Sequence, residues 1–370
     1  MKEKMMNRLV PALALALVVG TPVVAEDSNL RAVLSVLPDT VFSDLTPDVA
    51  RYLDLSALAE AHGGALGREA LSRALLGGGI RPAEALALGS PDSFAEKSGI
   101  DSAALAFVAG IGQPPGAVSV WGFADAEAAT AAFSGLSGRG FTELPSKMIA
   151  NGEPGIVDLA TRDPADPWRG PMGQASVVGL SGPALLQAGD GAALEPLLAG
   201  RPSALDTLAG RILLDALEAE EGAVLQAAFL GAWHGLGGGI DPATLAGKNP
   251  DEARAALEQA AAGASSGLPL WQGAALADLE TPEGPALVLA VAYTDCTDAQ
   301  AAADGAADLW REMDGTAEDL AEASVIESQP SGCAAILRIA GHDDTPRPFN
   351  QATHALMAGN LPALRIGTGD

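Results

Sequence analysis

The sequence predicts an α+β fold in which one structural unit is used twice, and two observations carry this prediction. The octapeptide Leu-Gly-Gly-Gly-Ile-Arg-Pro-Ala at residues 76–83 returns at residues 236–243, with Asp241 where the first copy has Arg81. The sequence also changes from a helical apolar period to a two-residue period, in the same order in both halves. Self-similarity at a fixed shift is typical of repeated units. Two further matches keep nearly the same shift: residues 57–63 with 216–222, and residues 198–200 with 357–359.

Each unit is expected to begin with helices. Apolar residues recur every three or four positions over residues 47–61 and 67–76 of the first unit and over residues 204–233 of the second, which is the helical period. The glycine triplets that follow are interpreted as helix stops, because glycine adopts the left-handed conformation that ends many helices. Pro82 and Pro242 then fit the first turn of the next helix.

A β-hairpin and a helix follow in each unit, and two strands and a helix close it. Alternating apolar residues around a Pro/Gly turn predict the hairpins, and the order of elements predicts an antiparallel sheet with helices on one face. The expected elements of the first unit are strands 104–111 and 117–123, helix 125–136, strands 175–180 and 184–188, and helix 192–199. Those of the second unit are strands 273–280 and 286–293, helix 298–313, strands 324–328 and 333–340, and helix 348–358.

The expected domains follow from this repeat. Residues 26–203 form the first α+β unit and residues 204–370 the second, and each is near the usual size of one domain. Two arrangements are open: separate domains, or two sheets joined about a pseudo-two-fold axis. Residues 29–37 and 364–366 are candidates for strands that tie the units together.

Residues 1–25 have the features of a signal peptide. Lys2, Lys4 and Arg8 precede an apolar stretch over residues 9–20, and small residues lead to a cleavage site after Ala25. The apolar stretch is shorter than the roughly 20 residues that span a bilayer. The mature protein is therefore expected to be periplasmic or secreted, with no transmembrane anchor after cleavage.

The composition limits the partners. The chain has 21 Lys and Arg against 47 Asp and Glu, which gives a formal net charge of −26 spread along the sequence. Nucleic acid and anionic lipid bind through fields of Lys and Arg that such an acidic protein lacks. Aromatic residues make up 4% of the chain, so few platforms are left for stacking sugars or bases.

The two cysteines of the chain, Cys296 and Cys333, are expected to form a disulfide. An even pair in an oxidising compartment is most simply a structural bridge. The alternative is a reactive thiol beside a histidine, and neither cysteine has a histidine next to it in the sequence.

Several short motifs are spaced along the first half: Tyr-Leu-Asp-Leu at residues 52–55, Gly-Ile-Asp at 99–101, and Pro-Pro-Gly at 114–116 before a strand that ends near Gly122. This spacing resembles that of secreted bacterial proteins grouped as domains of unknown function. The resemblance covers about half of the chain and includes no catalytic motif. It implies export and an α+β repeat, and it implies no activity.

A proline-rich loop over residues 163–169 is the first candidate for a ligand or partner site. It contains Asp166, Trp168 and Arg169, and loops of this kind often carry binding residues. The alternative is a plain surface connection with one packed tryptophan.

No catalytic residue, metal site or cofactor is predicted. Residues 263–267 match the Gly-x-Ser-x-Gly pattern around Ser265, but a nucleophile elbow needs a strand before it and a helix after it, and the order here is reversed. The glycine triplets follow helices, whereas a phosphate loop follows a strand. No histidine pair has the spacing of metal ligands on a helix. The sequence His342-Asp343-Asp344 combines metal-ligand residue types, but it is interpreted as a solvated turn because it lies in a loop before Pro346 and Pro348.

The expected function is that of an exported, non-catalytic envelope protein. It would bind a partner protein or a small molecule between its two repeated units, because clefts between domains are favoured binding sites. Two alternatives remain: a serine-type hydrolase of the envelope that uses Ser265 and His342, and a purely structural envelope factor.

Overall fold

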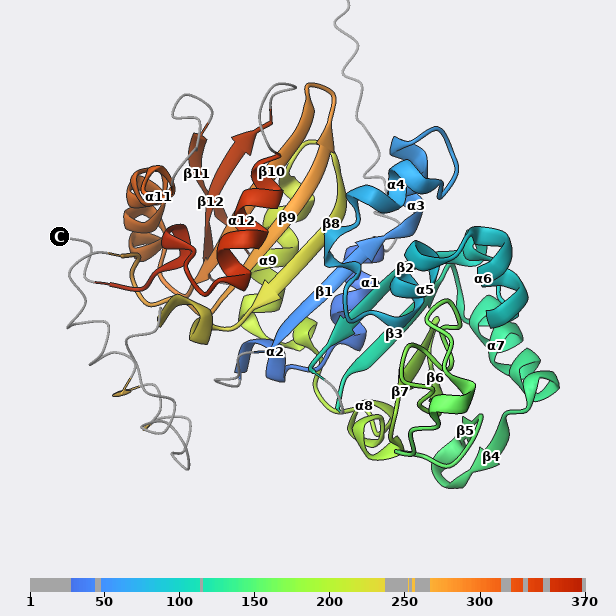
Figure 1. The fold of residues 1–370 in the computed structure, drawn as a ribbon. Helices are drawn as coiled ribbons and strands as arrows, with labels where there is room; N and C mark the ends of the chain where they lie inside the picture. Colours follow the sequence, from blue (N-terminus) through green and yellow to red (C-terminus); the bar gives the residue numbers. More distant parts are fainter. Residues whose placement is uncertain are drawn as a thin grey trace, which may run out of the picture.

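The computed structural model describes residues 28–43, 48–113, 116–236, 252, 255–256, 267–313, 321–328, 332–341 and 347–367. This part of the chain forms eleven α-helices and one antiparallel sheet of twelve strands, which confirms the predicted α+β class (Figure 1). The strands are β1 (Val49–Asp54), β2 (Leu105–Ile111), β3 (Val118–Phe123), β4 (Thr142–Leu144), β5 (Met148–Ala150), β6 (Val177–Ser181), β7 (Ala184–Ala188), β8 (Ala223–Leu230), β9 (Gly273–Thr281), β10 (Gly284–Tyr293), β11 (Ala321–Glu327) and β12 (Cys333–Ala340).

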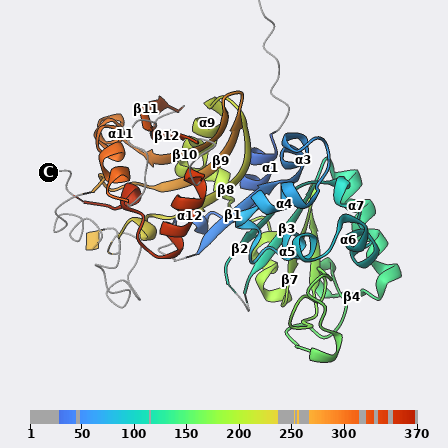
Figure 2. The same cartoon turned by 45° about the horizontal axis from the view of Figure 1, so that its top comes forward.

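Helices cover both faces of the sheet (Figure 1, Figure 2). The α5 face is covered by α3 (Leu55–Ala61), α4 (Arg68–Arg73), α5 (Arg81–Leu88), α6 (Pro91–Ser98), α7 (Ala126–Gly135), α11 (Cys296–Arg311) and α12 (Pro348–Met357). The α9 face is covered by α1 (Asn29–Val36), α2 (Thr40–Ser43), α8 (Glu195–Leu198) and α9 (Leu208–Ala219).

The prediction of helices on one face is therefore wrong. Strand β3 is buried along its whole length, and β9 and β10 are buried over most of theirs. A strand buried on both faces has a nearly continuous apolar sequence, as in Leu-Val-Leu-Ala-Val-Ala-Tyr within β10. This run is the sequence signal for a second layer of helices.

The two halves of the chain share one sheet. Strand β1 pairs with β8 in antiparallel register, with Tyr52 opposite Ala227. From this central pair, the order runs β1-β2-β3-β7-β6-β5-β4 to one edge and β8-β9-β10-β12-β11 to the other. Five strands in each half follow the same pattern from the centre outwards: the first three are in chain order, and the last two are exchanged, as β7-β6 and as β12-β11. Strands β4 and β5 are additions to the first half.

This central pair was not predicted. Residues 49–54 and 223–230 fall inside segments expected to be helical, whereas they form β1 and β8. Most residues of both strands are buried, so apolar positions occur at helical spacing and at strand spacing alike. The pairing of β1 with β8 in the middle of the sheet makes both segments strands rather than helices.

The internal duplication stays a prediction. The shared strand order of the two halves supports it, but the matched sequence segments do not lie in equivalent elements. Residues 57–63 lie in α3 and the turn after it, following β1, whereas their sequence match 216–222 begins in α9 and ends before β8. Residues 198–200 end α8 on the α9 face, while residues 357–359 end α12 on the α5 face. Residues 237–243 of the second glycine octapeptide lie outside the described residues.

The first octapeptide has the predicted role of a turn between helices. After α4, the short 3-10 helix Leu75–Gly77 ends at glycines, Gly79 has a φ of +84°, and Pro82 is in the first turn of α5. A positive φ is the conformation that glycine adopts without steric cost.

Both chain-end segments differ from the expected tie strands. Residues 29–36 form α1, which packs on the α9 face, and residues 362–364 form a 3-10 helix followed by a single bridge between Ile366 and Leu268. The signal peptide call, residues 1–25, lies outside the described residues. Among the helices that are described, none is long and apolar enough to cross a membrane.

Candidate functional site

The segment between β5 and β6, residues 151–176, holds all three residues predicted to bind a ligand. Two isolated bridges, Val157 with Gln174 and Asp163 with Gly170, close it into a compact loop. At its turn, Asp166 Oδ1 accepts a hydrogen bond of 2.8 Å from the amide of Trp168. This bond fixes the carboxylate of Asp166 relative to the two residues that follow.

Trp168 anchors this loop in the core of the α5 face. It is 3% exposed, and its ring stacks on Trp121 of β3 with centroids 4.4 Å apart and planes 7° apart. The ring of Phe141 is nearly perpendicular to it, with the two centroids 5.4 Å apart, and Trp168 Nε1 donates to the carbonyl of Ser98 at 3.0 Å. Trp168 is thus a packed tryptophan, as in the alternative interpretation of this loop. Its buried ring fixes the position of the neighbouring residues Asp166 and Arg169.

Gln187 of β7 connects the 151–176 loop to the sheet through hydrogen bonds. Its side-chain amide Nε2 donates to the carbonyl of Pro167 and to Ser176 Oγ, both at 2.7 Å. Its Oε1 accepts from Trp121 Nε1 at 2.9 Å, and all of these groups are buried. A buried network with its polar groups satisfied gives one defined geometry, so the loop is tied to the sheet.

A cavity of about 560 Å³ opens beside this loop, between α6 and the end of α7. Asp166, Trp168 and Arg169 all line it, so the structure brings the three predicted residues to one place. We call it the cationic cavity because three positive side chains line it. The complete lining is Lys97, Gly135, Gly138, Arg139, Phe141, Asn151, Asp166, Trp168 and Arg169.

The three cations are held by contacts that leave part of each free to bind. Arg139 Nη1 donates to the carbonyls of Glu96 and Lys97 in the last turn of α6, at 2.8 and 2.9 Å. Arg169 Nη2 donates to the carbonyl of Asn151. A guanidinium has five N–H donors, so each arginine is oriented by one nitrogen and keeps other donors for a ligand.

Two carboxylates lie beside these cations and differ in their pKa. Asp163 accepts a hydrogen bond of 2.6 Å from Lys97 Nζ, and this bond lowers the pKa of Asp163. Burial raises the pKa of Asp166, although its bond from the Trp168 amide and the charges of Lys97 and Arg169 act in the other direction. Within the described residues, Asp166 Oδ2 receives no protein hydrogen bond, so it is available to a donor on a ligand.

Lys97 and Arg139 were missed by the sequence reasoning. They lie far from residue 169 in sequence, and only the packing of α6 and α7 against the loop brings them together. The one signal in the sequence is the glycine at position 99. Gly99 ends α6 with a φ of +77°, and an added Cβ there would be 2.0 Å from Arg139 Nε. A glycine at that position allows the arginine to approach.

The junction between the two halves holds a buried ion pair. Arg73 at the end of α4 reaches Asp278 of β9 through Nε and Nη2, at 3.0 and 2.9 Å, and both side chains are buried. Gln226 of β8 donates to Asp278 at 2.9 Å and to the carbonyl of Arg73 at 2.7 Å. The cationic cavity, in contrast, is lined by residues of the first half alone.

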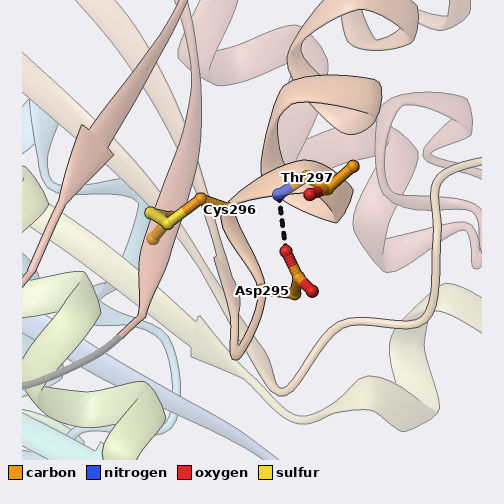
Figure 3. Close-up of a disulfide and its surroundings, with 4 residues drawn as sticks. Asp295, Cys296 and Thr297 are labelled. Carbon is orange, nitrogen blue, oxygen red and sulfur yellow. Dashed lines mark hydrogen bonds between the residues drawn. A yellow bond between two sulfur atoms is a disulfide. The ribbon is translucent and has the colours of Figure 1, made fainter.

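Cys296 and Cys333 form the predicted disulfide (Figure 3). It joins the first turn of α11 to the start of β12, with the two Cα atoms 5.1 Å apart. Asp295 precedes it and accepts a hydrogen bond of 2.7 Å from the amide of Thr297, which caps the helix. The bridge therefore fixes a helix to the sheet in the second half, away from the loop that holds Trp168.

Ser265 and His342, the residues of the hydrolase alternative, lie outside the described residues. Of the other histidines, His62, which follows α3 as its C-cap residue, contacts the carbonyl of Leu58 in that helix. Among the described residues, no three His, Cys, Asp or Glu side chains are grouped so that they could hold a metal ion.

Comparisons with known proteins add no relative. No family model matches the chain, and neither a curated protein nor a solved structure is significantly similar to it.

Proposed function

We propose that this chain is an exported, non-catalytic binding protein that holds a small anionic ligand in the cationic cavity. One observation carries the proposal: Lys97, Arg139 and Arg169, from three separate elements, converge on one cavity of a chain with a net charge of −26. Like charges placed together repel each other, so a counter-charge that binds between them is favoured. Export rests on the features of residues 1–25.

The size and chemistry of the cavity define the ligand class. Its volume of about 560 Å³ lies within the range of small-molecule sites. Guanidinium groups match the two oxygens of a carboxylate, and lysine adds a positive point charge. Asp166 offers an acceptor on the same wall, so a ligand with an ammonium or hydroxyl group next to its carboxylate is favoured.

Titration calorimetry with two matched probes tests this proposal. Succinate and L-aspartate have the same carbon chain, and L-aspartate adds an ammonium group for Asp166. We expect saturable binding of both and tighter binding of L-aspartate. A charge-assisted hydrogen bond contributes about 1.5–3 kcal/mol, so Lys97→Gln and Arg169→Gln should each weaken succinate binding about tenfold or more.

Two further variants separate binding from folding. Arg201→Gln changes an exposed arginine of the same half that does not line the cavity, and it should bind as the wild type does. Gly138→Phe places a large side chain at a lining position where an added Cβ would meet no atom within 4 Å, and it should lose binding at unchanged melting temperature. If neither probe binds the wild type, or if Gly138→Phe binds normally, the proposal is wrong.

A further inference from the structure

A second cavity, of about 360 Å³, lies over the central strand β1 on the α5 face. Leu53 of β1 and Leu55 form its floor, and α4, the glycine turn and α5 surround it. Pro171, from the loop that also carries Arg169, contributes to its wall. The lining residues are Leu53, Leu55, Leu71, Ala74, Gly77, Gly78, Ala83, Glu84, Ala87, Leu88 and Pro171.

The lining is aliphatic almost throughout. It includes no aromatic side chain, and its one charged side chain is Glu84. Glu84 Oε1 accepts a hydrogen bond of 2.8 Å from the amide of Gly79, which holds the carboxylate at the glycine turn. Leu88 lines the cavity although it is 65% exposed to solvent, so apolar surface continues from the cavity to its mouth.

The glycine turn contributes no side chain to this cavity. Gly77 and Gly78 line the cavity, and a Cβ at Gly78 would meet no atom within 4 Å. Gly78 has a φ of −61°, a conformation open to any residue. The glycine is therefore not required by the backbone at this position, and a larger side chain there would narrow the cavity.

We propose that this cavity binds a neutral aliphatic chain, as a site separate from the cationic cavity. Burial of apolar surface contributes roughly 25 cal/mol per Å² to the free energy of binding. An aliphatic wall provides few hydrogen-bonding groups, so this term dominates the binding of a ligand. The absence of aromatic lining residues favours a flexible alkyl chain over a flat ring, which gains from stacking. Glu84 and the net charge of −26 disfavour a chain with an anionic head group.

Titration of the full-length protein with 1-octanol and octanoate tests this inference. The two probes have the same number of carbons and differ in charge. We expect saturable octanol binding and at least tenfold weaker octanoate binding. Gly78→Leu and, independently, Ala87→Phe should each weaken octanol binding at least tenfold, since both positions are exposed and line the cavity.

Leu159→Gln is the matched control, because Leu159 is an exposed leucine outside the cavity lining. It should leave octanol binding unchanged. Failure of octanol to bind the wild type, equal binding of octanoate, or normal octanol binding by both Gly78→Leu and Ala87→Phe would each overturn the inference. The cationic cavity is tested apart from it: Gly78→Leu should still bind succinate, and Arg169→Gln should still bind octanol.

Discussion

The two halves of the sheet share a strand order but carry different additions. The first half inserts β4, β5 and the 151–176 loop between α7 and β6, and the cavities described here lie in this half. In the second half a disulfide ties α11 to β12. The comparison indicates that the same strand order carries two cavities in the first half and a cross-link in the second.

Breaking the buried ion pair at the junction tests whether the two halves unfold as one unit. This change has the largest expected effect on the free energy of unfolding. Arg73→Ala leaves Asp278 buried without a positive partner and with only the hydrogen bond from Gln226, which costs about 3–5 kcal/mol. We expect a fall of this size in the free energy of unfolding, measured by urea denaturation. Arg68→Ala removes an exposed arginine from the same helix and should change it by less than about 0.5 kcal/mol.

A repaired variant sharpens this prediction. Arg73→Met combined with Asp278→Leu removes both charges and should recover most of the lost stability, because a buried ion pair can be replaced by apolar packing. Equal stability of Arg73→Ala and the wild type would mean that the pair does not hold the halves together.

Removal of the disulfide should have the next largest effect and should act on the second half. Cys296→Ser combined with Cys333→Ser opens a loop with a sequence separation of 37, which costs roughly 3–4 kcal/mol on the chain-entropy estimate. Denaturation of oxidised wild type, reduced wild type and the variant measures this loss. Succinate affinity at low temperature should stay the same, and a parallel loss of affinity would show that the two halves are not independent.

The two aspartates of the loop should give the smallest effects, with opposite signs. Burial raises the pKa of Asp166, so the folded state favours its protonated form and ionisation costs stability at neutral pH. Asp166→Asn should therefore raise the free energy of unfolding at pH 7. This gain should disappear as the pH falls through the raised pKa of the folded state towards the ordinary value.

Asp163 is the matched control in the same loop. The hydrogen bond from Lys97 lowers its pKa, so ionised Asp163 stabilises the folded state above its ordinary pKa. Asp163→Asn should lower stability at pH 7, and the loss should vanish as the pH falls through the ordinary value towards the lowered one. Because both groups of this pair are partly exposed, the effect is small. Urea denaturation from pH 3 to pH 7 measures both variants, and equal signs would contradict the assignment.

The sequence predicted those parts of the fold that local pattern determines. The hairpins β2–β3 and β9–β10, the strand β12 and the helix α12 fall within a few residues of their predicted positions. The disulfide was also predicted correctly. Strands β4 and β5 were missed because each has only three residues, too few to show a period.

The candidate site was predicted only in part, for a physical reason. The loop composition identified Asp166, Trp168 and Arg169, which are neighbours in sequence. Lys97 and Arg139 join them only because α6 and α7 pack on the same face of the sheet. Such convergence depends on tertiary structure, and no local pattern records it.

The β1–β8 ladder also bears on how the chain is made. These strands begin roughly 170 residues apart, and a ribosome adds about 5–20 residues per second. For about 10–30 seconds of synthesis, the edge of β1 that later pairs with β8 has no strand with which to form backbone hydrogen bonds. An unpaired strand edge invites pairing with other chains. The strand at the centre of the finished sheet is thus an aggregation-prone edge of the growing chain.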